Sequence, residues 1–529
     1  MSFNDENTLA LQKVSLPSFS LLGCIRSGYY SFPDKQMVIE SDGSLTYADA
    51  YFRTTSLAWF LRSKQGIDET KTVLLSALNV ADYPVIVAAV QACGARLVLA
   101  TGSAEAQEIV GCARQVSPDL ALVSKPDLCE ALRAEYPSMP IFTVDSAHPD
   151  FESMEEIVRT WRSEGYLRNV AGAVDSGVVL FSSGSTGTPK AILNRSSSFA
   201  RSGTAVSGGF ALTENDVCYL PVPFSHTYGV VGMYAALLHR ATLVTLKKYR
   251  PESSLSMIVS SQASIYFGVP TMFLRELRIN DEGEWDVSCL RAGMIAGASC
   301  PEAVLGEYEE RFGCVLTQSY GVTETAATLT MTPMDATRRQ RATSVGLPID
   351  GVSFKIEEGT GEICTKSPSL MNGILHPDGS LDCPVDEDGW FHTGDVGAID
   401  DDGFLYITGR IKDMIIRGGI NIFPAEVENA YQEHEGIAES CLVGYPDPEL
   451  GERSCLCVIM KREDDPVSTS DLRLYAKGNV EKCKIPDTVI KLTDFPRLAN
   501  GKVNKKELRA YVSGLFCPDG QARKGSVSK

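Results

Sequence analysis

The chain has 529 residues, of which 44% are hydrophobic and 22% charged, a balance typical of a protein with a large buried core. Its formal net charge of −18 argues against nucleic acid and anionic membrane surfaces as partners, because both bind basic surfaces. The length predicts two or more lobes.

The cysteine content indicates a reducing compartment. The 15 cysteines are scattered without paired spacing and none of the 6 histidines lies near a cysteine pair, so we expect no zinc site. Cys455 and Cys457 would share one face of a strand and pack as thiols. The first residues lack the basic region and apolar core of a signal peptide, and no apolar window is long enough to span a bilayer. We therefore expect a cytoplasmic protein.

Strands and helices alternate in the first third of the chain. Thr46 follows a turn and can cap a helix together with Asp49. Strands are then predicted at 73–78, 96–100 and 120–123, separated by helices that end near residues 93 and 115. Such alternation is typical of right-handed βαβ units in a parallel sheet. Residues 145–173 are polar and are expected to be an irregular connector.

The stretch 178–190 is a predicted strand and loop that suit a polyphosphate. Four apolar residues, 178–181, predict a buried strand. Gly184 and Gly187 then allow a tight turn with exposed backbone N–H groups. The polar groups of this loop are Ser182, Ser183, Ser185, Thr186, Thr188 and Lys190. The loop matches neither the Walker motif nor the dinucleotide fingerprint, and its composition also fits a flexible linker.

Predicted strands and helices alternate again beyond this loop and then give way to antiparallel strands. Strands are predicted near 242–246, 265–267 and 293–295, with helices near 253–261 and 301–312. An antiparallel ribbon is expected over 352–365, and Asp402-Gly403 predicts a hairpin. Short strands and helices follow Arg410. The predicted domains are therefore residues 1–410 and residues 411–529.

Three further stretches carry groups that suit a nucleotide. Tyr320 can stack on a base, Thr323 can bind phosphate, and Glu324 is a carboxylate of the kind that holds Mg²⁺ beside phosphates, although such a stretch is also typical of a polar turn. Asp395, after a glycine turn, can accept both hydroxyls of a ribose. Gly418 and Gly419 allow close approach of another molecule. A fourth stretch, 496–502, ends on a loop lysine, which usually lies on the surface.

In this order, these stretches resemble the adenylate-forming (ANL) superfamily of acyl-CoA synthetases, peptide-synthetase adenylation domains and beetle luciferases. The resemblance runs from about residue 45 to residue 508. It implies an α/β fold: a large N-terminal domain of doubly wound sheets with helices and a small β-barrel-like part. A small α+β C-terminal domain that rotates on a hinge would follow. It also implies ATP, Mg²⁺ and coenzyme A as cofactors, with an acyl adenylate as intermediate.

The resemblance assigns a role to each matching residue. It places ATP or AMP against Ser182, Ser183, Gly184, Ser185, Thr186, Gly187, Lys190, Ala296, Gly297, Ala298, Ser319, Tyr320, Gly321, Thr323, Asp395 and Arg410. Glu324 is the implied Mg²⁺ ligand, Lys412 the hinge, and Gly418 and Gly419 serve the thioester step. The implied catalytic residues are Lys502, Thr323, Glu324 and His226, with Lys502 bridging the acid and the α-phosphate as charge builds up.

The implied acyl pocket combines small, apolar and aromatic residues. Its members are His226, Tyr228, Tyr266, Gly268, Ala296, Gly297, Gly321, Val322 and Ala326. This composition favours an uncharged acid of medium size or an aryl acid, and no cation is available to pair a second carboxylate. His226 is expected to shape or gate the pocket rather than act as a base.

The expected activity is an acyl-CoA ligase that releases AMP and pyrophosphate. One alternative is an adenylating enzyme that loads a separate carrier protein, and another is a catalytically silent nucleotide-binding protein. Ala191, Ser319, Ile374 and Leu498 depart from the usual family pattern without removing a charged group, which leaves the subfamily open. The sequence is compatible with a monomer or a homodimer.

Overall fold

The computed structural model describes residues 20–145, 148–161, 175–182, 189–280, 285–298, 300, 302–432, 434–462, 466–497 and 503–516. They divide into two units by packing. The first comprises the chain up to Ser353 together with Lys366–Phe391, and the second comprises Phe354–Thr365 and the chain from His392 onward.

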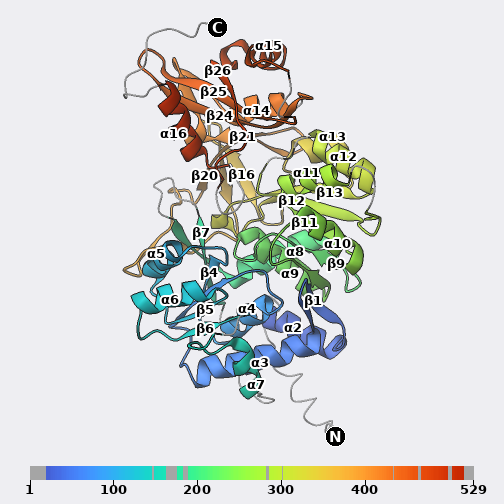
Figure 1. Cartoon of the computed structure of the whole chain (residues 1–529), viewed down its shortest axis with the longest axis vertical. Coiled ribbons are helices and arrows are strands. Elements are labelled where there is room, and N and C mark those ends of the chain that lie inside the picture. The colour runs from blue at the N-terminus through green and yellow to red at the C-terminus, as the bar shows by residue number, and fades with distance from the viewer. Residues whose placement is uncertain are drawn as a thin grey trace. The chain divides into compact units, whose positions relative to one another are not determined.

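The described part of the first unit contains two large sheets (Figure 1). The eight-stranded sheet has the order β19 (Leu381–Asp382), β18 (Gly373–Leu375), β8 (Lys190–Arg195), β7 (Gly177–Ser182), β4 (Arg96–Thr101), β3 (Thr72–Ala77), β5 (Leu120–Val123) and β6 (Ile141–Thr143). The nine-stranded sheet has the order β15 (Leu347–Pro348), β14 (Thr330–Met331), β13 (Val315–Tyr320), β12 (Ala292–Ala296), β11 (Ile265–Gly268), β9 (Val217–Tyr219), β10 (Thr242–Val244), β1 (Gln36–Glu40) and β2 (Gly43–Thr46).

Helices cover both faces of each large sheet, because the buried strands are apolar on both faces. The layer shared by the two sheets consists of α2 (Leu21–Ser31), α3 (Tyr47–Ser63), α4 (Tyr83–Ala92), α8 (Ser196–Gly209) and α9 (Thr227–Leu238). The outer layers are α5 (Ala106–Val116) and α6 (Pro126–Glu135) on one sheet, and α10 (Pro251–Ser261), α11 (Pro270–Ile279) and α12 (Glu302–Phe312) on the other. On β3, Val73 and Leu75 enter the shared core while Leu74 packs against the outer helices.

The second unit has two smaller sheets within the described residues. One has the order β16 (Ser353–Ile356), β17 (Glu362–Lys366), β20 (Phe391–Ile399) and β21 (Leu405–Arg410). The other has the order β23 (Ile420–Ile422), β22 (Ile415–Arg417), β25 (Gly451–Met460) and β24 (Ile437–Asp447), with β26 (Thr488–Lys491) also paired to β25. α14 (Pro424–Gln432) and α15 (Thr469–Asn479) cover one face of this sheet, and α16 (Lys505–Phe516) covers the other.

Several local predictions are confirmed. The α/β class holds, with a large N-terminal part and a smaller C-terminal one. Thr46 and Asp49 form a capping box at the start of α3. β20 and β21 form the predicted hairpin around Asp402-Gly403. Cys455 and Cys457 are fully buried on the α16 face of β25, and every described cysteine is a free thiol.

The expected irregular connector instead contains a helix, α7 (Met154–Thr160). Ser153 and Glu156 cap its first turn with reciprocal hydrogen bonds. The capping-box spacing was present in the sequence, but a seven-residue helix is too short to show clear apolar periodicity. The remaining short elements are α13 (Arg338–Thr343) and the 3₁₀ turns η2 (Thr323–Thr325), η3 (Ile411–Asp413) and η4 (Lys482–Lys484).

Candidate active site

Four neighbouring parallel strands of the nine-stranded sheet end at the same edge. β9 pairs in parallel with β11, β11 with β12, and β12 with β13. Gly268, Ala296 and Tyr320 are the last residues of β11, β12 and β13. The crevice outside the carboxyl ends of such strands is where open α/β sheets bind ligands. The fold therefore brings the predicted residues at the ends of β11, β12 and β13 to one edge.

The segment after β12 presents small, exposed residues. Gly297 has a φ of +85°, which side chains other than glycine rarely adopt, and it is exposed together with Ala298. Ala296 is half-buried and pairs with Ser319 of β13. This surface offers backbone groups without a side chain large enough to block access to them.

The turn after β13 is set by a close backbone contact. A Cβ atom at Gly321 would lie 1.5 Å from the carbonyl oxygen of Ala327, so only glycine fits this geometry. Tyr320 is half-buried just before it, and Thr323 and Glu324 are half-buried in η2. Ala326, predicted to line the acyl pocket, is fully buried in the shared core with a φ of +51°.

The strand that follows the serine- and glycine-rich stretch anchors this turn. Asn194 Nδ2 of β8 donates to Thr323 O at 3.0 Å. The Met371 N–H donates to Glu324 O at 2.7 Å. Ile192 packs with Val322 in one apolar cluster. Sequence reasoning missed Asn194, because its partner lies 129 residues further along the chain.

Lys190 belongs to the same face of β8 as these anchoring residues. Residues two apart share a face of a strand, so Lys190 joins Ile192 and Asn194 on the side of the Thr323–Glu324 turn. Lys190 is exposed and pairs across the hairpin with Ser182 of β7. The strand pair thus brings a positive charge to the predicted phosphate-binding turn. Ser183, Gly184, Ser185, Thr186 and Gly187 lie outside the described residues.

Aromatic residues lie beside β11 and β12 at this edge. Tyr228 Oη donates to Met294 O at 2.7 Å, and its ring meets that of Phe267 at 83° and 6.5 Å. Burial raises the pKa of the Tyr228 phenol well above its usual range, so it stays neutral. His226, half-buried, is the N-cap residue of α9. The start of α9 packs tightly, because a Cβ at Gly229 would lie 2.1 Å from Pro223 O.

Tyr266, predicted to line the same pocket, faces the opposite side of β11, so this prediction is wrong. Its hydroxyl donates to Glu276 at 2.7 Å within the outer core. Phe267 takes its place beside Tyr228 because successive strand residues point to opposite faces. Gly268 shares the Tyr266 face of β11, since a Cβ atom there would lie 2.7 Å from the ring of Phe273 in the outer core.

The predicted ribose-binding pair is intact in the second unit. Asp395 of β20 and Arg410 of β21 stand opposite each other, and Arg410 Nε lies 2.6 Å from Asp395 Oδ1. Asp395 is buried, whereas the Arg410 side chain is 45% exposed. The Asp395 N–H donates to Thr393 Oγ1, which itself donates to Ile363 O. The carboxylate is therefore held by the strand pairing and by the neighbouring arginine.

The remaining predicted residues of the second unit lie in turns. Lys412 is exposed in η3, directly after β21. Gly418 and Gly419 form the exposed two-residue turn between β22 and β23, with φ of +58° and +84°. Such a turn requires positive φ at both positions. Lys502 lies outside the described residues, although Arg497 and Val503 on either side of it form an antiparallel bridge.

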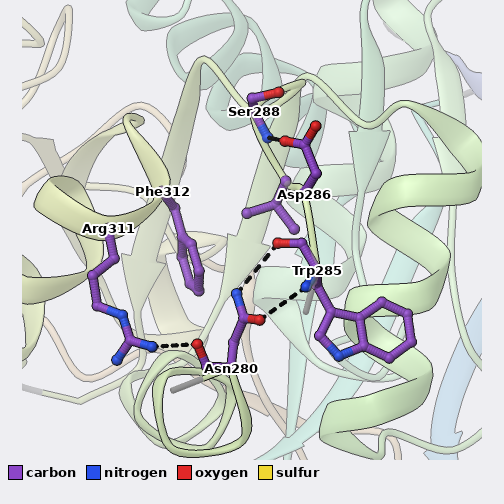
Figure 2. Close-up of a pocket in the computed structure, with 7 residues that line it drawn as sticks. Asn280, Trp285, Asp286, Ser288, Arg311 and Phe312 are labelled. Atoms are coloured by element: carbon purple, nitrogen blue, oxygen red, sulfur yellow. Dashed lines mark hydrogen bonds between the residues drawn. The ribbon is translucent and has the colours of Figure 1, made fainter. Parts of the chain in front are cut away.

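A surface pocket of about 420 Å³ lies elsewhere in the first unit (Figure 2). Its side chains are engaged with one another: Asn280 and Trp285 exchange two hydrogen bonds, Arg311 donates to Asn280 O, and Asp286 accepts from the Ser288 N–H. None of the predicted site residues lines it. These contacts join Trp285 to the end of α11 and the end of α11 to α12.

Two family models match this chain: AMP-binding enzyme over residues 27–375, and AMP-binding enzyme C-terminal domain over residues 426–502. The chain therefore belongs to the adenylate-forming superfamily and is an AMP-forming ligase. Among the described helices, none combines the length and the apolar composition needed to cross a bilayer.

Individual relatives agree with this assignment. A Rhodococcus jostii 3-[(3aS,4S,7aS)-7a-methyl-1,5-dioxo-octahydro-1H-inden-4-yl]propanoyl:CoA ligase is 34% identical, over 66% of this chain and 68% of that protein. The medium-chain fatty-acid–CoA ligase of Escherichia coli is 27% identical, over 98% of this chain and 95% of that protein. The crystal structure of ATP-bound MatB from Rhodopseudomonas palustris has a TM-score of 0.83 at 23% identity, covering 94% of this chain and 99% of that one, and so shares the fold.

Proposed function

We propose that this ligase joins a carboxylic acid to coenzyme A in two steps. The acid's carboxylate oxygen first attacks the α-phosphorus of ATP, so that pyrophosphate leaves and an acyl adenylate remains. The coenzyme A thiolate then attacks the acyl carbon and AMP leaves. The observation that carries the proposal is the common edge formed by the carboxyl ends of β9, β11, β12 and β13, which collects nucleotide-type and acyl-type residues side by side.

The phosphates of ATP would bind the first unit. Lys190 supplies positive charge, and Thr323 a hydroxyl on a turn held by Asn194 and Met371. The backbone of residues 183–188 and the hydroxyl of Ser182 would hold the β- and γ-phosphates. The adenine would stack on Tyr320, beside the small residues Ala296, Gly297 and Ala298, with Ser319 and Gly321 at the end of β13.

Glu324 is the residue that would hold Mg²⁺. It is a half-buried carboxylate on a turn whose backbone is fixed, and carboxylate oxygen is the donor that Mg²⁺ prefers. When bound, the ion supplies charge neutralisation for the phosphates. The protein's own part is to hold the ligand oxygen at the end of β13.

The second unit would supply the contacts to the ribose and the positive charge of Lys502. Asp395 and Arg410 are positioned on paired strands to hold the ribose. We propose that residues 411–529 act as the mobile domain after residues 1–410, with rotation at Lys412. In one orientation Lys502 would offset the repulsion between the acid and the α-phosphate. In the other, Gly418 and Gly419 would approach the thiol.

The acid is proposed to be uncharged and apolar apart from its carboxylate. Tyr228, Phe267, Gly268, Ala296 and Val322 carry no positive charge, so a second carboxylate would be buried without a partner. His226 would shape the pocket entrance from the start of α9. The two relatives described above act, by their names, on a bicyclic propanoate and on medium-chain fatty acids. Medium-chain and cyclic acids are therefore the first to test.

The deciding experiment is an AMP-release assay with a panel of acids, with and without coenzyme A. The panel contains straight-chain acids of increasing length, aryl acids, cyclic propanoates and dicarboxylates. We expect turnover with medium-length or cyclic monoacids, dependent on coenzyme A. Product formed on a carrier protein but not on coenzyme A would refute coenzyme A as the acyl acceptor. Absence of pyrophosphate exchange with every acid would refute the proposed ligase activity.

A further inference from the structure

Three side chains with different ligand atoms meet on the central strands of the four-stranded sheet. Glu362 and Cys364 lie two residues apart on β17, so they share a face of that strand. His392 lies on β20, the neighbouring strand. His392 Nδ1 is 2.9 Å from Glu362 Oε2 and 3.4 Å from Cys364 Sγ. The three ligand atoms all lie within 4.8 Å of one another.

These distances are close to those around a tetrahedral zinc ion. Zn–S and Zn–N bonds of about 2.3 and 2.0 Å place sulfur and nitrogen about 3.5 Å apart, and the observed separation is 3.4 Å. The 2.9 Å separation between the carboxylate oxygen and the imidazole would have to widen by about 0.4 Å. The same oxygen lies within 4.8 Å of the sulfur and would have to sit about 3.5 Å from it. A thiolate, an imidazole and a carboxylate form a donor set that suits Zn²⁺ better than Mg²⁺ or Ca²⁺.

The surroundings hold these ligands in place. The Gly394 N–H donates to Glu362 Oε1 at 2.8 Å, which turns the other carboxylate oxygen towards His392. Such outer hydrogen bonds orient the ligands of metal sites. Cys364 is fully buried, the Glu362 side chain is 13% exposed, and the His392 side chain is 40% exposed. The cluster is thus open to solvent on the histidine side.

We propose that Glu362, Cys364 and His392 form a Zn²⁺ site, with a fourth position open to water beside His392. Binding would displace the proton of the Cys364 thiol and any proton on His392 Nδ1. The sequence led us to expect no zinc site, because Cys364 and His392 are 28 residues apart and only strand pairing unites them. The proposal is independent of the ligase reaction proposed above.

Occupancy would stabilise the strand pair that leads to Asp395. His392 and Asp395 share β20, and Thr393 between them donates to Ile363 O of β17. A metal bound only by the folded protein raises its stability by mass action. We therefore expect Zn²⁺ to raise the melting temperature of the full-length protein.

The test is titration of metal-free, full-length protein with Co²⁺, followed by displacement with Zn²⁺. One equivalent of Co²⁺ should give a thiolate-to-metal charge-transfer band, and Zn²⁺ should abolish it. Cys364→Ser should lose the band, and His392→Gln should weaken binding about 100-fold or more. Cys483→Ser is the matched control, because Cys483 lies 3.6 Å from Glu481 but is not one of the three clustered ligands.

Absence of stoichiometric binding, or a band that persists in Cys364→Ser, would overturn the proposal. His392→Gln alters a partly exposed side chain and so tests the site even where Cys364→Ser fails to fold. Unweakened binding in His392→Gln would equally refute it. The melting temperature with and without Zn²⁺ provides a readout that does not depend on enzyme activity.

Discussion

Asp395 and Arg410 face each other across a β-hairpin, with the arginine Nε 2.6 Å from the buried carboxylate. An arginine beside a carboxylate forms a charge-assisted hydrogen bond, which fixes the position of both side chains. The pair is thus preorganised before any nucleotide binds, because strand register and not the ligand sets its separation.

Removing the carboxylate of Asp395 should weaken nucleotide binding. Asp395→Asn keeps the side-chain shape but loses the charge-assisted hydrogen bonds, so we expect the KM for ATP to rise about 10- to 100-fold. Asp402→Asn makes the same charge change at the exposed turn of the same hairpin and should leave the KM unchanged. An unchanged KM in Asp395→Asn would refute the ribose role.

Lys502 should matter only for adenylate formation. Lys502→Ala is expected to lower pyrophosphate exchange by about 100-fold or more, because an electrostatic contact to the reacting anions is lost. It should still transfer the acyl group from a supplied acyl adenylate to coenzyme A. Lys506→Ala, at an exposed lysine of α16, is the control.

Gly419 should show the reverse pattern. Gly419→Leu places a bulky side chain on the exposed turn proposed to approach the thiol, so thioester formation should fall while pyrophosphate exchange persists. Gly359→Leu carries a similar strain at a φ of +88° in open space and serves as the control. Loss of the same half-reaction in Lys502→Ala and Gly419→Leu would contradict a domain that works in two orientations.

Gly321 should be intolerant of any side chain. Gly321→Ala puts a Cβ 1.5 Å from Ala327 O, so the turn after β13 must shift, at a cost of about 3 kcal/mol. We expect a lower midpoint of chemical unfolding and a lower kcat/KM. Gly208→Ala in α8 meets no atom within 4 Å and should be neutral or stabilising. Equal stability of the two variants would show that the turn after β13 can move away from the added Cβ atom without a loss of stability.

Glu276 should make stability depend on pH. Burial raises the pKa of Glu276 to about 7, although the hydroxyls of Ser254, Tyr266, Tyr249 and Tyr308 hydrogen-bond to the carboxylate and favour its charged form. The folded protein therefore holds this proton more tightly than the unfolded chain. The resulting stabilisation is fully present below pH 4.5 and is lost as the pH rises through 7, by about 3 kcal/mol in total.

Glu276→Gln should remove this dependence, because an amide does not titrate in this range. Urea unfolding of wild type and variant at pH 5, 6, 7 and 8 measures the difference between them. We expect the free energy of unfolding of wild type to fall relative to the variant across this range. Glu302→Gln, at an exposed carboxylate, should run parallel to wild type. Parallel curves for wild type and Glu276→Gln would show that the carboxyl does not titrate there.

Many secondary-structure elements and candidate site residues could be predicted from residues that are contiguous in the sequence. The alternation of strands and helices over residues 73–123 follows from runs of neighbouring apolar side chains. The helix start at Thr46 follows from a four-residue capping box. Tyr320, Thr323, Glu324 and Asp395 were predicted as nucleotide-binding residues from chemistry that is local to each motif. Such signals depend on period and spacing along the chain, which folding does not alter.

Only the tertiary structure decided which of these motifs meet. Parallel pairing brings Gly268, Ala296 and Tyr320 to one edge, and the face of β11 puts Phe267 rather than Tyr266 beside Tyr228. The hydroxyls around Glu276 and the cluster of Glu362, Cys364 and His392 likewise join separate segments. Strand register and strand face depend on long-range packing, and a one-residue shift would reverse which side chains meet. The sequence by itself therefore determined the class of this ligase, and the pairing of its strands determined which of its residues lie together.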